Sequence, residues 1–236
     1  METQINEIAP DIYRLSTYVP DVAPPAGFTF NQFVVRGEQP FLFHTGMRQL
    51  FPHVSEALEK VAGLERLRWI SFGHVEADEC GSVNQFLAAA PDAQVTHGLL
   101  GCMVSLNDLC DRPPVPADGV SLDIGGHVMR FIATPHVPHN WESGVWFDET
   151  TKTLLAGDLF TSLGDGPALV ETDLVEGAMV AEEVFHASSI SATIPATIRS
   201  LAALEPQTIA CMHGSSFQGD GAAQLRALAD AYEALV

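Results

Sequence analysis

Apolar runs that predict β-strands occur in two batches along this chain, and helical segments accompany each batch. The first batch has strands at residues 12–19, 28–36, 40–44, 66–72 and 94–97, with helices at 49–62 and 81–90. The second has strands at 126–133, 143–147, 153–156 and 208–212, with helices at 171–188, 195–204 and 221–235. This order favours two sheets with helices on their outer faces over one doubly wound sheet. The expected fold class is α/β, with the layers ordered as in an α+β protein.

Length and charge restrict the size of the domain and the kinds of partner. The 236 residues are 47% hydrophobic, which suits one domain over residues 1–236 with a sizeable core. The 30 acidic and 11 basic side chains give a formal net charge of −19. Neither nucleic acid nor a membrane surface is expected as a partner, because the phosphates of both would repel this chain.

Several sequence features point to a cytoplasmic protein. Residues 1–10 lack the basic start and apolar segment of a signal peptide, and no apolar run approaches the roughly 20 residues that span a bilayer. The four cysteines lack Cys-x-x-Cys spacing, so neither a thiolate zinc site nor a redox pair is indicated. A reducing cytoplasm is therefore the expected location.

A ligand-rich segment follows the predicted strand at residues 66–72. It reads His74-Val75-Glu76-Ala77-Asp78-Glu79, and His74, Glu76 and Asp78 are spaced two apart. If the strand direction continues into the turn, these three side chains point the same way. One imidazole and two carboxylates that converge at a strand end predict part of a metal site.

Three later segments offer further ligands just past the ends of strands. They contain His136 with His139, Asp158, and His213. Taken with one of the two neighbouring histidines, the complete set has three imidazoles and three carboxylates: His74, Glu76, Asp78, His139 or His136, Asp158 and His213. Such a set is too large for one ion and suits two ions about 3.5–4 Å apart, with Asp158 as the expected bridge.

The types of ligand favour iron. Zinc hydrolase sites prefer imidazole-rich sets, whereas two imidazoles and one carboxylate on an ion is a non-haem iron pattern that manganese also tolerates. Glu76 is the residue that decides this preference, because a histidine at its position would make the set richer in nitrogen.

These motifs, together with Thr134-Pro135, Gly157-Asp158 and His213-Gly214, resemble those of the metallo-β-lactamase superfamily. In most of that superfamily the first motif is His-x-His-x-Asp-His, whereas Glu76 stands here at the second histidine position. The chain thereby resembles the flavodiiron proteins, whose motif is His-x-Glu-x-Asp-His. The resemblance implies a four-layer αββα sandwich, the metallo-β-lactamase fold, with two iron ions at one edge of the sheets.

The chain departs from the flavodiiron pattern in two respects. Flavodiiron proteins carry a flavodoxin domain of roughly 150 further residues, and none follows Val236, so no FMN is expected. The resemblance is thus to stand-alone oxygen-binding diiron proteins, with electrons from an external donor protein and a homodimer left open. In addition, Glu79 occupies the position of the last histidine of the motif, where it would either bind a metal ion or act through a water or a hydrogen bond.

The fourth ligand has two candidates. His139 precedes Trp141-Glu142-Ser143, which resembles the His-Trp-Pro-Asp-Ser run of the family, and its distance from Asp158 along the chain also suits the family. We therefore prefer His139 as the ligand and expect His136 either to support a ligand from behind through a hydrogen bond or to line a channel to the site.

Three functions from different classes agree with these residues. The leading expectation is a non-haem diiron protein that binds or reduces dioxygen, or nitric oxide, in an oxidoreductase-like manner. The second is a binuclear zinc, manganese or iron hydrolase that cleaves an ester, a thioester or a lactone through a metal-bound hydroxide. The third is a diiron sensor that reports oxygen to a partner without turnover.

Overall fold

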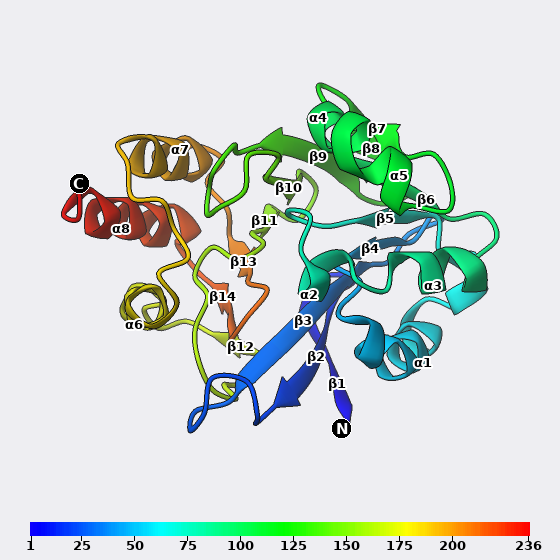
Figure 1. The fold of residues 1–236 in the computed structure, drawn as a ribbon, viewed down its shortest axis with the longest axis horizontal. Coiled ribbons are helices and arrows are strands. Elements are labelled where there is room, and N and C mark those ends of the chain that lie inside the picture. Colours follow the sequence, from blue (N-terminus) through cyan, green and yellow to red (C-terminus); the bar gives the residue numbers. More distant parts are fainter.

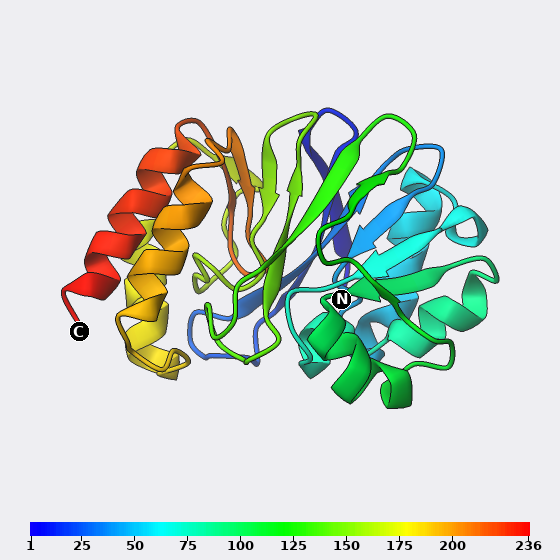
Figure 2. The same cartoon turned by 90° about the horizontal axis from the view of Figure 1, so that it is seen from above.

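The computed structural model describes residues 1–236 and arranges them in four layers (Figure 1). Two seven-stranded sheets lie face to face, and helices cover the outer side of each sheet, as Figure 2 shows most clearly. The predicted αββα sandwich is therefore confirmed. No helix combines the length and the apolar character that crossing a membrane would need.

The first sheet contains the N-terminal strands in sequence order. Its strands are β1 Thr3–Ala9, β2 Ile12–Val19, β3 Phe28–Val35, β4 Phe41–Phe43, β5 Trp69–Ser71, β6 Gln94–His97 and β7 Val115–Pro116. Neighbours are antiparallel from β1 to β4 and parallel from β4 to β7. Its helical segments are η1 Arg48–Leu50, α1 Phe51–Val61, η2 Leu64–Arg66, α2 Ala77–Cys80, α3 Val83–Ala89, α4 Leu99–Gly101, η3 Cys102–Leu106 and α5 Asn107–Leu109.

The second sheet has the order β12-β14-β13-β11-β10-β9-β8. Its strands are β8 Ser121–Asp123, β9 Val128–Ala133, β10 Gly144–Asp148, β11 Thr153–Leu155, β12 Leu169–Val170, β13 Thr208–Ala210 and β14 Ser216–Gln218. Helices α6 Val175–Phe185, α7 Thr193–Ala202 and α8 Gly221–Glu233 cover its outer side. The adjacent strands β11 and β13 run parallel, so the loops that follow them leave the sheet at the same edge.

Burial on both faces of each sheet explains the apolar runs of the sequence. Val34 and Leu42 pack under the outer helices of the first sheet, whereas their neighbours Phe33 and Phe43 pack between the two sheets. Successive side chains of a strand point to opposite faces. A strand between a helix layer and a second sheet therefore needs apolar residues at nearly every position.

Several short elements differ from the expectation. Residues 3–9 form an edge strand, and residues 115–116 pair as β7, although neither segment is among the expected strands. Residues 99–109 are helical, and the expected helix 171–188 is shortened to Val175–Phe185. The strands β1 and β7 lie at the edges of the sheet, where backbone pairing can form a strand without a regular apolar pattern. The helical differences lie on the surface.

Asp148 fixes the turn between β10 and β11 from inside the protein. Its buried carboxylate accepts hydrogen bonds from His127 Nδ1 at 2.8 Å and from the Thr151 hydroxyl at 2.6 Å. The backbone N–H groups of Thr150 and Thr151 donate to it as well, each at 3.1 Å. Burial alone would raise the pKa of this carboxyl, but the hydrogen bonds outweigh burial and hold the pKa below its ordinary value.

We expect Asp148→Asn to lower the free energy of unfolding by about 1–3 kcal/mol at neutral pH, because a charged acceptor of several hydrogen bonds is lost. The folded-state pKa lies below the unfolded value of about 3.9, so this contribution is complete above that value and disappears as the pH falls through the folded pKa. The difference between the two proteins should therefore shrink in acid. Urea titrations at neutral pH and at about pH 3 measure it.

Glu149→Gln is the matched control, because it breaks only the exposed ion pair of Glu149 with Arg130 at 2.9 Å. It should change the stability by less than about 1 kcal/mol. Equal effects of the two substitutions would contradict the role of Asp148 in the turn.

Candidate metal centre

The loop after β5 carries three of the six predicted ligands. β5 ends at Ser71, and Glu76 caps the start of the one-turn helix α2 with an extended backbone, φ −136° and ψ 155°. Asp78 lies in the first turn of α2. The expectation that the strand direction continues through His74, Glu76 and Asp78 is therefore wrong. The three side chains are brought together by a turn and a helix start, because α2 already begins at Ala77.

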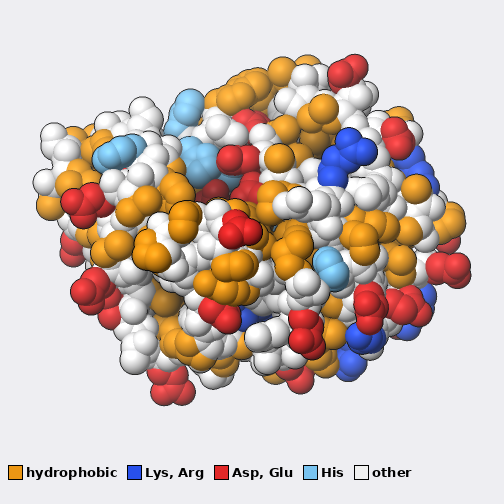
Figure 3. All heavy atoms as spheres, turned by 60° about the horizontal axis from the view of Figure 1, so that its bottom comes forward, with side chains coloured by type: hydrophobic (Ala, Val, Ile, Leu, Met, Phe, Trp, Pro, Cys, Tyr) orange, Lys and Arg blue, Asp and Glu red, His pale blue; other side chains and the backbone are white.

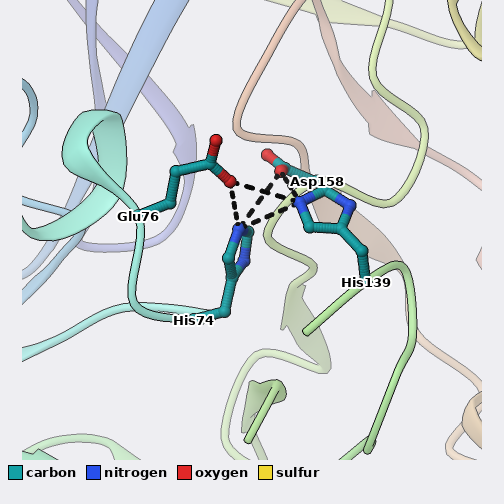
Figure 4. Close-up of side chains that lie close together, drawn as sticks. All are labelled: His74, Glu76, His139 and Asp158. Atoms are coloured by element: carbon teal, nitrogen blue, oxygen red, sulfur yellow. Dashed lines mark hydrogen bonds and ion pairs between the residues drawn. The ribbon is translucent and has the colours of Figure 1, made fainter. Parts of the chain in front are cut away.

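Four side chains from three loops converge on one point, as Figure 4 shows. His74 Nε2 lies 2.7 Å from Glu76 Oε2 and 3.0 Å from His139 Nε2. Asp158 Oδ2 lies 3.2 Å from His139 Nε2 and 3.8 Å from His74 Nε2. One ligand atom from each of the four residues lies within 4.8 Å of the others, so two imidazoles and two carboxylates could share one cation.

A second group lies on the other side of Asp158. His213 Nε2 is 3.2 Å from Asp158 Oδ1 and 3.4 Å from Asp78 Oδ2. The Asp158 carboxylate thus presents one oxygen to each group. The three imidazoles divide two to one, so the expected pattern of two imidazoles is met in the first group only.

The chemistry of these donors fits a pair of divalent cations. Asp158 Oδ1 is buried and has no hydrogen-bond partner despite its short distance to His213. A buried carboxylate oxygen without a partner is costly, and a bound cation would offset that cost. The six residues predicted as ligands supply carboxylate oxygens and imidazole nitrogens, which iron and manganese accept as ligands.

Neighbouring groups orient two of the imidazoles from behind. His213 Nδ1 donates a hydrogen bond to the carbonyl oxygen of Thr29 at 2.7 Å. His74 Nδ1 lies 3.1 Å from Glu79 Oε1. Both contacts favour a proton on Nδ1, so Nε2 is the nitrogen of each ring that is available to a cation. This is the usual arrangement behind metal-binding histidines.

Glu79 does not join either group. It is fully buried, and its Oε2 accepts the backbone N–H groups of Gly73 at 2.6 Å and His74 at 2.7 Å. Its Oε1 faces the Nδ1 side of His74 and lies 3.5 Å from His44 Nε2. Of the two roles expected for Glu79, this position favours action through hydrogen bonds on a ligand.

The two candidate histidines of the third loop are also separated. The His139 imidazole lies in the first group, whereas His136 is exposed. His136 has a left-handed backbone, φ 65°, and its N–H donates to the carbonyl of Asn140 at 2.8 Å. His136 does not belong to the group of four side chains that converge.

Supporting residues on the first sheet were missed from the sequence. Asn31 Nδ2 donates to the carbonyl oxygens of Cys211 and Gly214, both at 2.9 Å, and Arg14 donates to Gly214 at 3.0 Å. These contacts hold the loop that carries His213. Asn31 is one of three polar residues, with Thr29 and Gln32, in the fully buried strand β3, and this was the only sequence signal for its role.

The electrostatics of the cluster favour protonated imidazoles in the absence of a cation. Burial alone would lower the pKa of His74, but the Glu79 and Glu76 carboxylates outweigh it and raise the pKa to about 12. Burial is likewise outweighed at His213 and His139, where Asp158 above all raises the pKa to about 10 and to about 9. Hydrogen bonds from His139 and His74 lower the pKa of Glu76 to about 2.

Comparison with protein families gives a match that contains all six candidate ligands. Residues 28–214 match the family model described as ODP family beta lactamase. A type A flavoprotein of Rhodobacter capsulatus is 30% identical over 142 residues, which is 58% of this chain and 32% of that relative. The matched segment spans about a quarter to a half of the length of the curated relatives it matches.

Solved structures share the fold across almost the whole chain. A metal-soaked Flv1 flavodiiron core from Synechocystis has a TM-score of 0.84 at 22% identity, covering 99% of this chain and 61% of that one. The rubredoxin oxygen:oxidoreductase of Desulfovibrio gigas has a TM-score of 0.78 at 16% identity, covering 98% and 62%. With the family match, these results confirm the resemblance that the sequence predicts.

We expect cation binding to release protons and to weaken as the pH is lowered. Because the pKa values of His74, His139 and His213 are raised, a cation that takes their Nε2 atoms must displace protons. Calorimetry with Mn²⁺ in two buffers of different ionisation enthalpy measures the number of protons released. His53→Gln, on α1 outside the cluster, should leave that number unchanged. An affinity that is independent of pH, without proton release, would contradict this assignment.

Proposed function

This chain belongs to the ODP family of beta lactamases, and we propose that it is a non-haem diiron protein that binds or reduces dioxygen or nitric oxide. The observation that carries this proposal is the Asp158 carboxylate. One of its oxygens faces His74 and His139, and the other faces His213. A carboxylate between two sets of ligands is suited to bridging two ions.

The ligands would be divided as follows. His74, Glu76 and His139 would hold one ion, Asp78 and His213 the other, and Asp158 both. Three carboxylates against three imidazoles make this set richer in oxygen than a typical zinc hydrolase site, which supports iron or manganese. When bound, two ferrous ions would supply part of the electrons that reduction of dioxygen requires.

Aromatic side chains would shield one of the ligands, His213, from water and hold its ring in place. The ring of Phe28 stacks on His213 at a centroid distance of 4.1 Å, and Phe30 contacts the same imidazole edge-on at 5.3 Å. Exclusion of water strengthens the interactions between the charged groups of such a site. The residues of the chain thus supply orientation and a low dielectric, and the metal supplies the redox chemistry.

The electrons would come from a separate donor protein. The name of one structural neighbour, a rubredoxin oxygen:oxidoreductase, pairs that protein with such a donor. The matched relative from Rhodobacter capsulatus is a flavoprotein of which the matched segment is 32%. A flavin or another redox carrier outside residues 1–236 would therefore serve this centre.

We expect the protein to retain two iron ions per chain after anaerobic reconstitution with ferrous iron, and its optical spectrum to change on exposure to air. Asp158→Asn should abolish retention of the pair, because both positions lose charge from their shared carboxylate. Asp108→Asn removes the same charge from an exposed site and should still retain two ions. Iron and protein assays after desalting provide the measurement.

Other results would redirect the proposal. If iron is not retained at two per chain and air produces no optical change, the diiron function is wrong. Turnover of esters, thioesters or lactones by zinc-loaded protein, without a response to oxygen, would support the hydrolase expectation. Reversible oxygen binding without net consumption would support the sensor.

A further inference from the structure

A cavity of about 660 Å³ opens beside the candidate metal centre and extends toward α6 and α8. In Figure 3, histidine and acidic side chains meet in a hollow of the surface, with hydrophobic side chains around it. At ~30 Å³ per molecule, the volume corresponds to about 20 waters and falls within the range of organic ligand sites. Dioxygen alone would leave most of this cavity empty.

The walls of the cavity are largely aromatic. Phe28, Phe30, Phe160 and Phe185 contribute to its lining, and Phe28 contacts Phe185 at a centroid distance of 5.5 Å. Phe185 is 42% exposed at the surface of α6. An apolar ring that entered between these side chains would gain contact area and shield them from water.

The charges of the lining select against anions. Glu76, Asp78, Asp158 and Glu182 line the cavity, and no lysine or arginine does. Outside the six candidate metal ligands, Glu182 is the only charged side chain of the lining, so it sets the charge at the α6–α8 end. A carboxylate or phosphate at the α6–α8 end would be repelled, whereas a cation or a hydrogen-bond donor would be attracted.

The end of the cavity remote from the metal centre contains an ordered carboxylate. Glu182 Oε2 accepts the hydroxyl groups of Ser188 at 2.6 Å and Tyr232 at 3.1 Å. Glu182 Oε1 accepts only the backbone N–H of Ser188, at 3.1 Å. Since each carboxylate oxygen has two lone pairs, Oε1 can accept one more donor. The three existing bonds fix the carboxylate in place before a ligand arrives.

We propose that this cavity is a binding site for an arylalkylamine, in which a short alkyl chain joins an aromatic ring to a protonated amine. The ammonium group pairs with Glu182, and the ring lies between the phenylalanine side chains with its far edge toward the candidate metal centre. The site goes beyond the proposed oxygen chemistry and requires no particular metal. It gives the protein an organic ligand that shares one cavity with the metal-binding groups.

Three small probes separate ring binding from simple attraction to an acidic surface. Phenethylamine carries the ring and the cation, phenylpropanoate carries the ring and an anion, and n-butylamine carries the cation without a ring. Calorimetry on metal-free and iron-loaded protein should show one phenethylamine per chain, bound about tenfold or more tightly than either other probe. Equal affinity for phenylpropanoate or for n-butylamine would overturn the proposal.

Two neighbouring glutamates on α6 provide a matched pair of variants. Glu182→Gln should weaken phenethylamine binding about tenfold, because a charged acceptor is replaced by a neutral one. Glu183→Gln removes the same charge from an exposed side chain that does not line the cavity, and should leave binding unchanged. Equal losses in the two variants would overturn the assignment of Glu182. Thermal unfolding of both variants checks the fold.

A further variant tests the cavity without touching the Glu182 hydrogen bonds. Ala187 lines the cavity but is exposed, so Ala187→Trp should narrow the opening without strain in the core and weaken phenethylamine binding. Unchanged binding in this variant would overturn the location of the site.

Measurement of iron content separates this inference from the proposed function. Phenethylamine binding without retained iron would overturn only the diiron function, and retained iron without phenethylamine binding would overturn only the amine site.

Discussion

The candidate metal centre depends on hydrogen bonds that lock the two sheets together beneath it. Thr29 and Asn31 on β3 of the first sheet hold the loop after β13 of the second sheet through His213 Nδ1 and the carbonyls of that loop. Gly214 has φ +85° and passes so close to Ser162 that a Cβ would collide with its hydroxyl. Because each group of ligands draws residues from both sheets, any shift between the sheets would separate the ligands within each group.

A second set of contacts joins the sheets at the other side of the centre. The N–H of Gly144 on β10 donates to the carbonyl of Gly73 at 2.8 Å, and Trp146 donates to the hydroxyl of Ser71 at 2.8 Å. The loop after β5 is thereby fixed to the second sheet as well. Buried hydrogen bonds of this kind are costly to break, so they give the loops of the site a rigid base.

Buried negative charge is the main electrostatic feature of this site. Glu79 places a buried carboxylate behind His74, and Asp158 places another between the two ligand groups. Such a concentration of negative charge under a partly apolar surface is unfavourable unless cations or protons neutralise it. A further carboxylate, Glu182, lines the neighbouring cavity and is not among the metal-binding groups, so it remains available to the proposed amine.

The sequence by itself determined the layers of the fold and the candidate ligands. Short, nearly continuous apolar runs indicate strands that are buried between two layers. His or Asp residues just past those runs indicate loops at a sheet edge that carry functional side chains. The edge strands β1 and β7 were not predicted from the sequence, because backbone pairing needs no apolar pattern. Only the tertiary structure decided that the imidazoles divide two to one, that His139 and not His136 faces the centre, and that Glu79 turns behind His74. These outcomes depend on where loops from different sheets meet and on how each side chain turns, and local sequence carries no information on either.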